Sequence, residues 1–220
     1  GPSGMLYVTA ELKESILLVD PKARTIGGTI PTGSNATHFF AMTSDQKKLF
    51  TSNVSAATVS VIDVPARTLV TTVSTGSGNQ RMTVSPDDRW FVTSIGQGRK
   101  MSFFRTSDYQ LDFDGALDGS PFVARFSPDG RFVYNMGNAP RGATPAGIRV
   151  WKVDVASRKA VATSSDTLGT GTGGIQVSPF NGRVYISAYS GQVTALDPDT
   201  LKVVKQFPVP ATPDGLFFGR

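Results

Sequence analysis

One histidine, two arginines and one aspartate are the residues best placed to do chemistry in this sequence. His38 is the only histidine among 220 residues and directly precedes a predicted strand. An imidazole can act as a general base or contact a ligand near neutral pH. Arg81 and Arg125 lie in apolar strands, where a guanidinium needs solvent, a carboxylate or an anionic ligand. Asp214 is the one carboxylate at a comparable strand entrance.

The remaining polar residues match no familiar catalytic or metal-binding pattern. One imidazole does not make a histidine-cluster metal site, and the sequence has no cysteine to act as a thiolate ligand. We find no nucleophile-elbow pattern and no paired carboxylates in the apolar strands for glycosidase chemistry. The glycine-rich run 169–174 lacks the Lys-Ser/Thr ending of a phosphate loop. We therefore expect no catalytic residue, no metal ligand and no cofactor.

Four aspartates recur at one place in the pattern, at the end of a predicted strand or in the turn after it: Asp20, Asp63, Asp154 and Asp197. A residue that returns in nearly every unit is better explained by the unit than by one reaction. We expect each carboxylate to accept hydrogen bonds from the backbone of the turn that follows it.

The elements that position these residues form a repeat of about forty residues, which is typical of propellers and solenoids. Its clearest strand starts at positions 6, 49, 90, 132 and 184, so successive copies are 43, 41, 42 and 52 residues apart. An apolar strand and a turn such as Ser127-Pro128-Asp129-Gly130 come before it, as in a hairpin. Two further β-branched strands follow it. The pattern predicts an all-β, five-bladed β-propeller of four-stranded antiparallel blades.

The strands of each blade are named here inner, second, third and outer. We expect them at 39–42, 49–53, 59–63 and 69–73; at 81–84, 90–94, 100–104 and 110–113; at 123–126, 132–136, 148–152 and 160–163; and at 174–177, 184–188, 193–197 and 203–207. The first blade has strands at 6–10, 16–20 and 26–30, and we expect 215–218 to supply its inner strand. This pairing would close the ring and remove a free sheet edge.

Several segments resemble the YVTN family of β-propeller repeats, namely 6–9 with 15–20, 58–63 with 67–70, and 195–204. That family occurs in surface-layer proteins and in secreted or periplasmic proteins of bacteria and archaea. The resemblance therefore implies a propeller in the periplasm or outside the cell. Its members range from binding scaffolds to lactonase-like enzymes, so no single function is implied. They usually carry seven blades, and five would be a departure.

Composition and charge limit which partners are possible. The formal net charge is +5, but acidic and basic residues alternate in the turns and no basic run occurs. Because no aromatics interleave with the basic residues as a stacking platform, we expect no nucleic-acid partner. No apolar run approaches the roughly 20 residues of a membrane span. We expect a monomer with one domain over residues 5–220, and residues 1–4 resemble a cloning or cleavage remnant.

Two faces of the predicted propeller differ in how repetitive they are. The outer-to-inner connections and the second-to-third connections share one face, called here the loop face, and the other turns share the turn face. The loop face has the least repetitive sequence and the longest insertion, 137–147. Irregular loops on a rigid scaffold are frequent sites of function. The binding residues we expect there are His38, Arg81, Arg99, Asn138, Arg141 and Tyr189.

Three functions remain open. The leading hypothesis is a non-catalytic, exported scaffold that binds a protein or an extracellular polymer through the loop face. The alternative is a lactonase- or lyase-like enzyme that uses a metal or His38 at the channel mouth, with an ion near Glu11, Asn53 or Asp214. The third is a structural module of a larger surface-layer protein.

Overall fold

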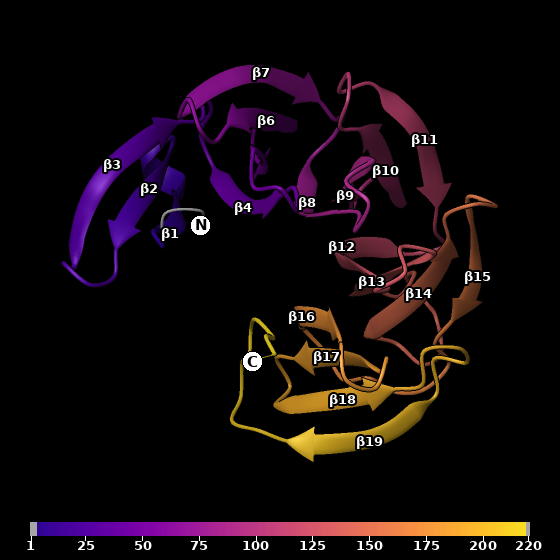
Figure 1. The fold of residues 1–220 in the computed structure, drawn as a ribbon. Helices are drawn as coiled ribbons and strands as arrows, with labels where there is room; N and C mark the ends of the chain where they lie inside the picture. Colours follow the sequence, from indigo (N-terminus) through magenta and orange to yellow (C-terminus); the bar gives the residue numbers. More distant parts are fainter. Residues whose placement is uncertain (1–3, 219–220) are drawn as a thin grey trace.

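The computed structural model describes residues 4–218 and shows five antiparallel sheets arranged along an arc (Figure 1). The first sheet contains β1 (Leu6–Ala10), β2 (Ser15–Asp20) and β3 (Thr25–Pro31), with the short 3-10 helix η1 (Glu11–Lys13) between β1 and β2. The second contains β4 (Thr37–Met42), β5 (Lys48–Asn53), β6 (Thr58–Asp63) and β7 (Thr68–Ser74). The third contains β8 (Asn79–Val84), β9 (Trp90–Ile95), β10 (Lys100–Arg105) and β11 (Leu111–Ala116). The fourth contains β12 (Ser120–Phe126), β13 (Phe132–Asn138), β14 (Ile148–Asp154) and β15 (Lys159–Thr163). The fifth contains β16 (Thr172–Val177), β17 (Val184–Ala188), β18 (Gln192–Leu196) and β19 (Val203–Pro208).

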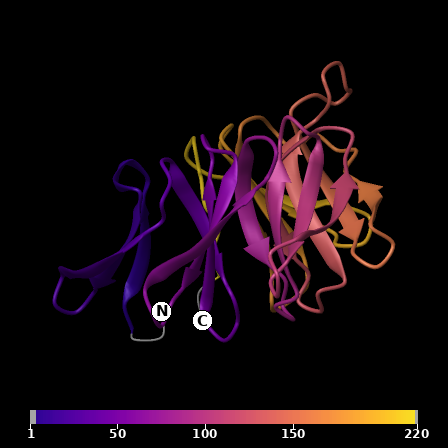
Figure 2. The ribbon, with the colours of Figure 1, turned by 90° about the horizontal axis from the view of Figure 1, so that it is seen from above.

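The predicted all-β, five-bladed architecture is confirmed. Consecutive strands pair as antiparallel neighbours in every sheet, with β4, β8, β12 and β16 facing the centre of the arc (Figure 1). Seen from above, the sheets stand side by side, and the connection between β13 and β14 extends beyond its neighbours (Figure 2). In residues 4–218, no helix is long and apolar enough to span a membrane.

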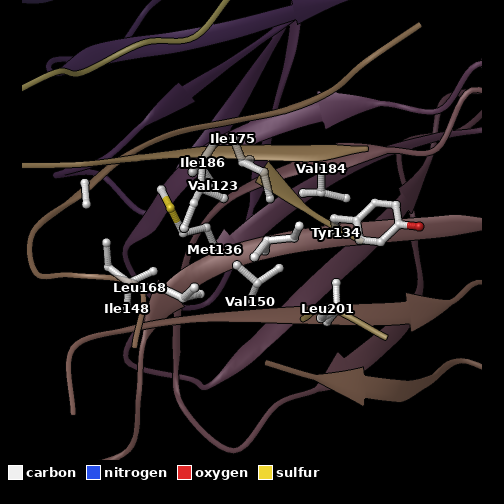
Figure 3. Packing of buried hydrophobic residues seen from close by; sticks show 12 residues of the cluster. Val123, Tyr134, Met136, Ile148, Val150, Leu168, Ile175, Val184, Ile186 and Leu201 are labelled. Atoms are coloured by element: carbon white, nitrogen blue, oxygen red, sulfur yellow. The ribbon is translucent and has the colours of Figure 1, made fainter. Parts of the chain in front are cut away.

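Apolar side chains fill the four spaces between successive sheets. Between the fourth and fifth sheets, Tyr134 and Met136 of β13 pack in one cluster with Val184 and Ile186 of β17 (Figure 3). The third-sheet rings of Phe91 and Phe104 stack 5.0 Å apart, in the layer shared with the second sheet. Full burial of one such side chain stabilises a fold by about 1.5–3 kcal/mol. The alternation of apolar residues along each strand therefore holds neighbouring blades together.

The buried Ser52 and Asn53 at the end of β5 link the strands of one blade. Asn53 is fully buried; its amide nitrogen donates to Thr58 and Ser60, and its amide oxygen accepts from Thr37. Such partners are required, because a buried polar group without a hydrogen bond destabilises the fold. Asn53 is therefore a structural residue rather than an open position for an ion.

The chain ends differ from the predicted ring closure in this structure. Residues 215–218 form no strand with β1, and β1 pairs only with β2. The C-terminal segment instead lies against the fifth sheet, where Ser187 Oγ donates to the Asp214 carbonyl at 2.6 Å and the ring of Phe218 meets Tyr185. This is the side of β16 on which a following inner strand is expected, so closure of the ring stays a prediction. Residues 1–3 of the expected remnant lie outside the described residues.

Candidate functional site

A β-bulge at the start of each complete inner strand turns side chains toward the channel. The pairing register shifts between Thr37 and Phe39 on β4, and equivalent shifts occur on β8, β12 and β16. The residues left out of register are His38, Gln80, Arg81, Phe122, Gly173 and Gly174. Bulges commonly re-aim side chains at functional sites. These four bulges bring residues from four blades to the same end of the channel, which is called the mouth below.

Arg81 occupies the centre of this mouth and is only 8% exposed. Its guanidinium lies 5.2 Å from the ring centre of Phe39 and 4.8 Å from that of Phe122, on the two neighbouring inner strands. It donates to the Gly173 carbonyl at 3.3 Å and to Asp214 Oδ1 at 3.0 Å. Arg81 therefore joins inner strands across the channel, and its carboxylate partner is already in place.

Arg125 adds a second guanidinium to the channel wall. It lies 5.7 Å from the ring centre of Phe39 and donates to the Ala124 carbonyl at 2.8 Å. Among residues 4–218 it has no carboxylate within ion-pair distance. Burial, helped by the nearby charge of Arg81, lowers the pKa of Arg125 to about 10. The channel thus holds two guanidiniums and the one carboxylate of Asp214.

His38 lies at the rim rather than in the channel. Its Nδ1 is 3.7 Å from Glu11 Oε2, and both side chains are exposed. Thr9 Oγ1 donates to the His38 carbonyl at 2.9 Å, which ties the rim of β4 to β1. The imidazole therefore faces a carboxylate and solvent. Within residues 4–218, His, Asp and Glu side chains form no group of three that could hold a metal ion.

The other predicted binding residues form a second group on the loop face. Asn138, Arg141 and Tyr189 are all exposed: Asn138 ends β13, Arg141 lies in the connection that follows it, and Tyr189 lies in the connection between β17 and β18. Both connections are hydrogen-bonded at their bases to the connection between β15 and β16: Ile148 N donates to the Gly169 carbonyl, and Tyr189 N to the Gly171 carbonyl. Arg99 is also exposed but stands apart, in the turn between β9 and β10.

A family model for YNCE-like β-propellers matches residues 2–113. The chain belongs to the YNCE-like β-propeller family. No curated protein matches the sequence. Among solved structures, the chain is similar to Kuenenia stuttgartiensis hydrazine synthase, with a TM-score of 0.75 and 17% identity over 87% of this chain. It spans about half of that chain, 52% of its length. At this identity the likeness shows the fold alone.

The repeated aspartates of this YNCE-like propeller do what the sequence predicted. Asp20, Asp63, Asp154 and Asp197 each accept a hydrogen bond from the backbone of the following turn. The backbone hydrogen bond from Ser157 lowers the pKa of Asp154, and the one from Thr200 does the same for Asp197. These carboxylates are part of the turns.

On the turn face, the propeller has a cleft that the sequence pattern did not predict. Its volume is about 380 Å³, and it lies between the third and fourth sheets. The lining residues are Asp87, Arg89, Trp90, Phe113, Asp129, Gly130, Arg131, Val155, Ala156 and Arg158. Each of the three arginines covers an aromatic ring, an arrangement that the sequence analysis did not anticipate. The adjacent pairs Arg89-Trp90 and Arg131-Phe132 were the signal available in the sequence.

Proposed function

We propose that this YNCE-like propeller is a non-catalytic, exported scaffold that binds a protein or an extracellular polymer through its loop face. One observation carries the proposal: the exposed Arg141 and Tyr189 stand on two connections that are each hydrogen-bonded at the base to the connection between β15 and β16. Arginine and tyrosine are enriched at the energetic centres of interfaces, and rigid support reduces the entropy lost on binding. A periplasmic or extracellular location is part of the proposal and rests on the resemblance to exported YVTN-repeat proteins.

The residues of the channel also favour a scaffold, because they are already engaged with one another. The guanidinium of Arg81 is held by Asp214 and two aromatic rings, so it fixes the inner strands relative to one another. A ligand that replaced this arrangement would first have to break a largely buried ion pair, which is costly. The exposed loops therefore suit a partner better than the centre of the channel does.

The test compares wild-type protein with the double variant Arg141→Ala, Tyr189→Ala. Immobilised wild type is exposed to fractionated periplasmic and secreted material of the source organism, and each retained component is purified and measured by surface plasmon resonance. Loss of two interface anchors should weaken the best binder at least tenfold. Arg67→Ala, on the turn face, is the matched control and should bind like wild type. Unchanged binding by the double variant would remove the loop face from the proposal.

A lactonase- or lyase-like enzyme is the second candidate, and the pairing of His38 with Glu11 at 3.7 Å favours it. A carboxylate beside an imidazole can orient it as a general base. Hydrolysis of a panel of lactones by wild type, together with its loss in His38→Gln, would establish this function. No turnover, with and without added Ca²⁺, Mg²⁺ or Mn²⁺, would discard it.

A further inference from the structure

The cleft on the turn face opens where a link between blades is missing. Between the second and third sheets, Ser44 donates through its backbone and its hydroxyl to the carboxylate of Asp88, joining the two turns. The repeat places Pro86 and Gly130 at the equivalent positions of the next interface. Proline has no N–H and glycine has no side chain, so these residues cannot form the link that Ser44 and Asp88 make. A Cβ added to Gly130 would lie 3.5 Å from Pro86 Cδ, an ordinary van der Waals distance. The turns of the third and fourth sheets therefore leave room between them.

Each of the three arginines of the cleft lies over an aromatic ring. Arg89 lies 4.3 Å from the ring centre of Trp90, and Arg158 lies 4.6 Å from that of Phe113. Arg131 lies 4.8 Å from the ring centre of Phe132. Stacking immobilises a guanidinium while leaving its in-plane N–H groups available, the geometry that matches carboxylate and sulfate oxygens.

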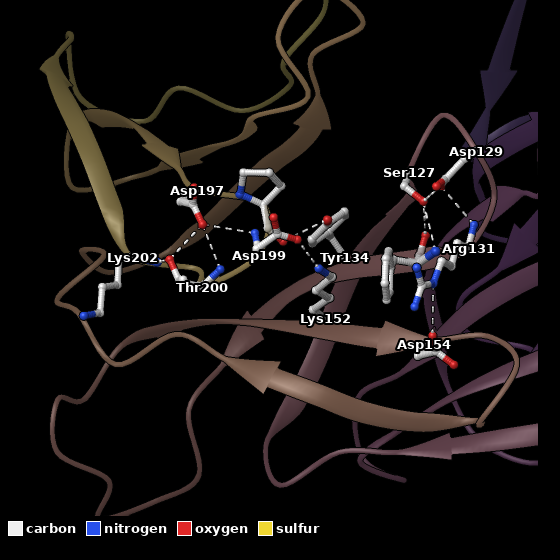
Figure 4. Close-up of polar contacts among 12 residues, drawn as sticks. Ser127, Asp129, Arg131, Tyr134, Lys152, Asp154, Asp197, Asp199, Thr200 and Lys202 are labelled. Carbon is white, nitrogen blue, oxygen red and sulfur yellow. Dashed lines mark hydrogen bonds and ion pairs between the residues drawn. The ribbon is translucent and has the colours of Figure 1, made fainter.

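Internal carboxylates leave much of this hydrogen-bonding capacity unused. Arg131 Nε is 3.6 Å from Asp154 Oδ2 (Figure 4), and Arg158 is 3.7 Å from Asp112 Oδ1, both longer than a charged hydrogen bond. In residues 4–218, Arg89 has no carboxylate within ion-pair distance. An anionic ligand would find three oriented donors with weak competition.

The cleft also offers acceptors. Asp87 and Asp129 use Oδ1 to hold their own turns, through Ser85 and Arg89 N in one case and through Ser127 and Arg131 N in the other. Neither Oδ2 has a hydrogen-bond partner in the described part of the chain. The cleft can therefore accept hydrogen bonds from the hydroxyl groups of a ligand as well as bind its negatively charged groups.

A second hollow of about 230 Å³ adjoins the first and shares Arg89 and Trp90 with it. The far side of this hollow is lined by Arg105, Thr106 and Ser107, so the polar surface continues along the turn face. An extended ligand could occupy both hollows with the stacked Arg89 between them. A small anion would use only part of this surface.

We propose that this cleft binds an acidic polysaccharide, a chain of sugars that bears carboxylate or sulfate groups. The guanidiniums receive the acid groups, and the two aspartates receive sugar hydroxyls. Nucleic acid fits less well, because base stacking needs open aromatic faces. Here Phe113 stacks on Phe103 on one side and lies under Arg158 on the other. The site is separate from the loop face and does not depend on it.

Isothermal titration calorimetry at fixed salt tests the proposal with the full chain. The probes are alginate oligosaccharide for carboxylates and dextran sulfate for sulfates, with neutral dextran, polyglutamate and single-stranded DNA as comparisons. Arg89→Gln and Arg158→Gln should each weaken the better acidic polysaccharide about tenfold, because a charged hydrogen bond is lost. Arg183→Gln, at the equivalent turn position of the fifth sheet, should leave binding unchanged, and matching thermal unfolding verifies folding of all three variants.

Some outcomes overturn the proposal. These are no binding of either acidic polysaccharide, equal losses in Arg183→Gln, or unchanged binding in both cleft variants. Tighter binding of polyglutamate or DNA than of both acidic polysaccharides would replace it with a peptide or nucleic-acid site. Since Arg141 and Tyr189 lie on the opposite face, their double variant should bind the polysaccharide like wild type, which keeps this test separate from that of the proposed function.

Discussion

Arg81 on β8 donates a 3.0 Å hydrogen bond to Asp214, a residue 133 positions later in the C-terminal segment. The guanidinium is nearly buried, whereas the carboxylate is half-exposed. The pair therefore links the middle of the chain to its C-terminal segment through the channel. A bulge on β8 makes this possible by turning Arg81 out of the strand register.

Asp214→Asn should reduce the free energy of unfolding by about 1–2 kcal/mol, because it leaves the buried Arg81 charge without its carboxylate. Urea denaturation of both proteins measures the change. Glu11→Gln is the control, since Glu11 and its partner His38 are both exposed; this substitution should leave the free energy of unfolding nearly unchanged. Equal effects of the two substitutions would mean that the Arg81–Asp214 pair contributes no more to stability than an exposed ion pair does.

Arg125→Met should stabilise the protein by about 1–2 kcal/mol at pH 7. The pKa of Arg125 is lowered to about 10, which means that burial and the charge of Arg81 disfavour the charged form. The unfolded chain then binds more protons between about pH 10 and the ordinary arginine value, so wild-type stability should rise with pH in that window. The variant should lack this rise. A less stable variant would indicate that the guanidinium contributes favourable contacts that outweigh its desolvation.

Gly137→Ala should destabilise the fold by about 2–3 kcal/mol. A Cβ at this position would overlap the Ser120 carbonyl oxygen and lie 2.7 Å from Pro121 Cα, both of them backbone atoms at the bulge of β12. Gly78→Ala is the control, because its nearest neighbour would be the Val54 carbonyl oxygen at 3.8 Å. Thermal unfolding of the two variants should separate them clearly.

The repeat was sufficient to predict all nineteen strands of the structure, with ends shifted by at most three residues. Alternating apolar residues and Ser-Pro-Asp turns fix these elements locally. The bulges at Arg81 and Phe122 were not predictable, because a register shift depends on the partner strand as well as on local sequence. The stacking of Arg158 on Phe113 has the same origin, since it joins residues of different blades.

Five turn aspartates should make stability sensitive to acid: Asp45, Asp108, Asp129, Asp154 and Asp197. Hydrogen bonds from the turns lower the pKa values of four of them below 3.8, and the Arg105 side chain, followed by the backbone of Gln110, does so for Asp108. Their contribution is therefore complete above the unfolded value of about 4 and is lost as pH falls through the lowered folded values. Melting temperatures of wild type should fall below about pH 4. Asp197→Asn should start lower at pH 7 and fall less; an identical pH profile would contradict the assignment.

Closure of the ring by 215–218 and β1 is the remaining prediction. The outer face of the first sheet exposes Leu6, Val8 and Ile26, and Phe217 is 88% exposed, so pairing would cover apolar surface as well as a free edge. The register of β4 with β5, where Phe40 faces Thr51, places Leu216 opposite Val8 in a closed blade. The chain has no cysteine, so Val8→Cys with Leu216→Cys should form an intramolecular disulfide on mild oxidation. Ile26→Cys with Leu216→Cys is the control and should remain reduced. Two free, reactive thiols in the first pair would show that the ends stay apart.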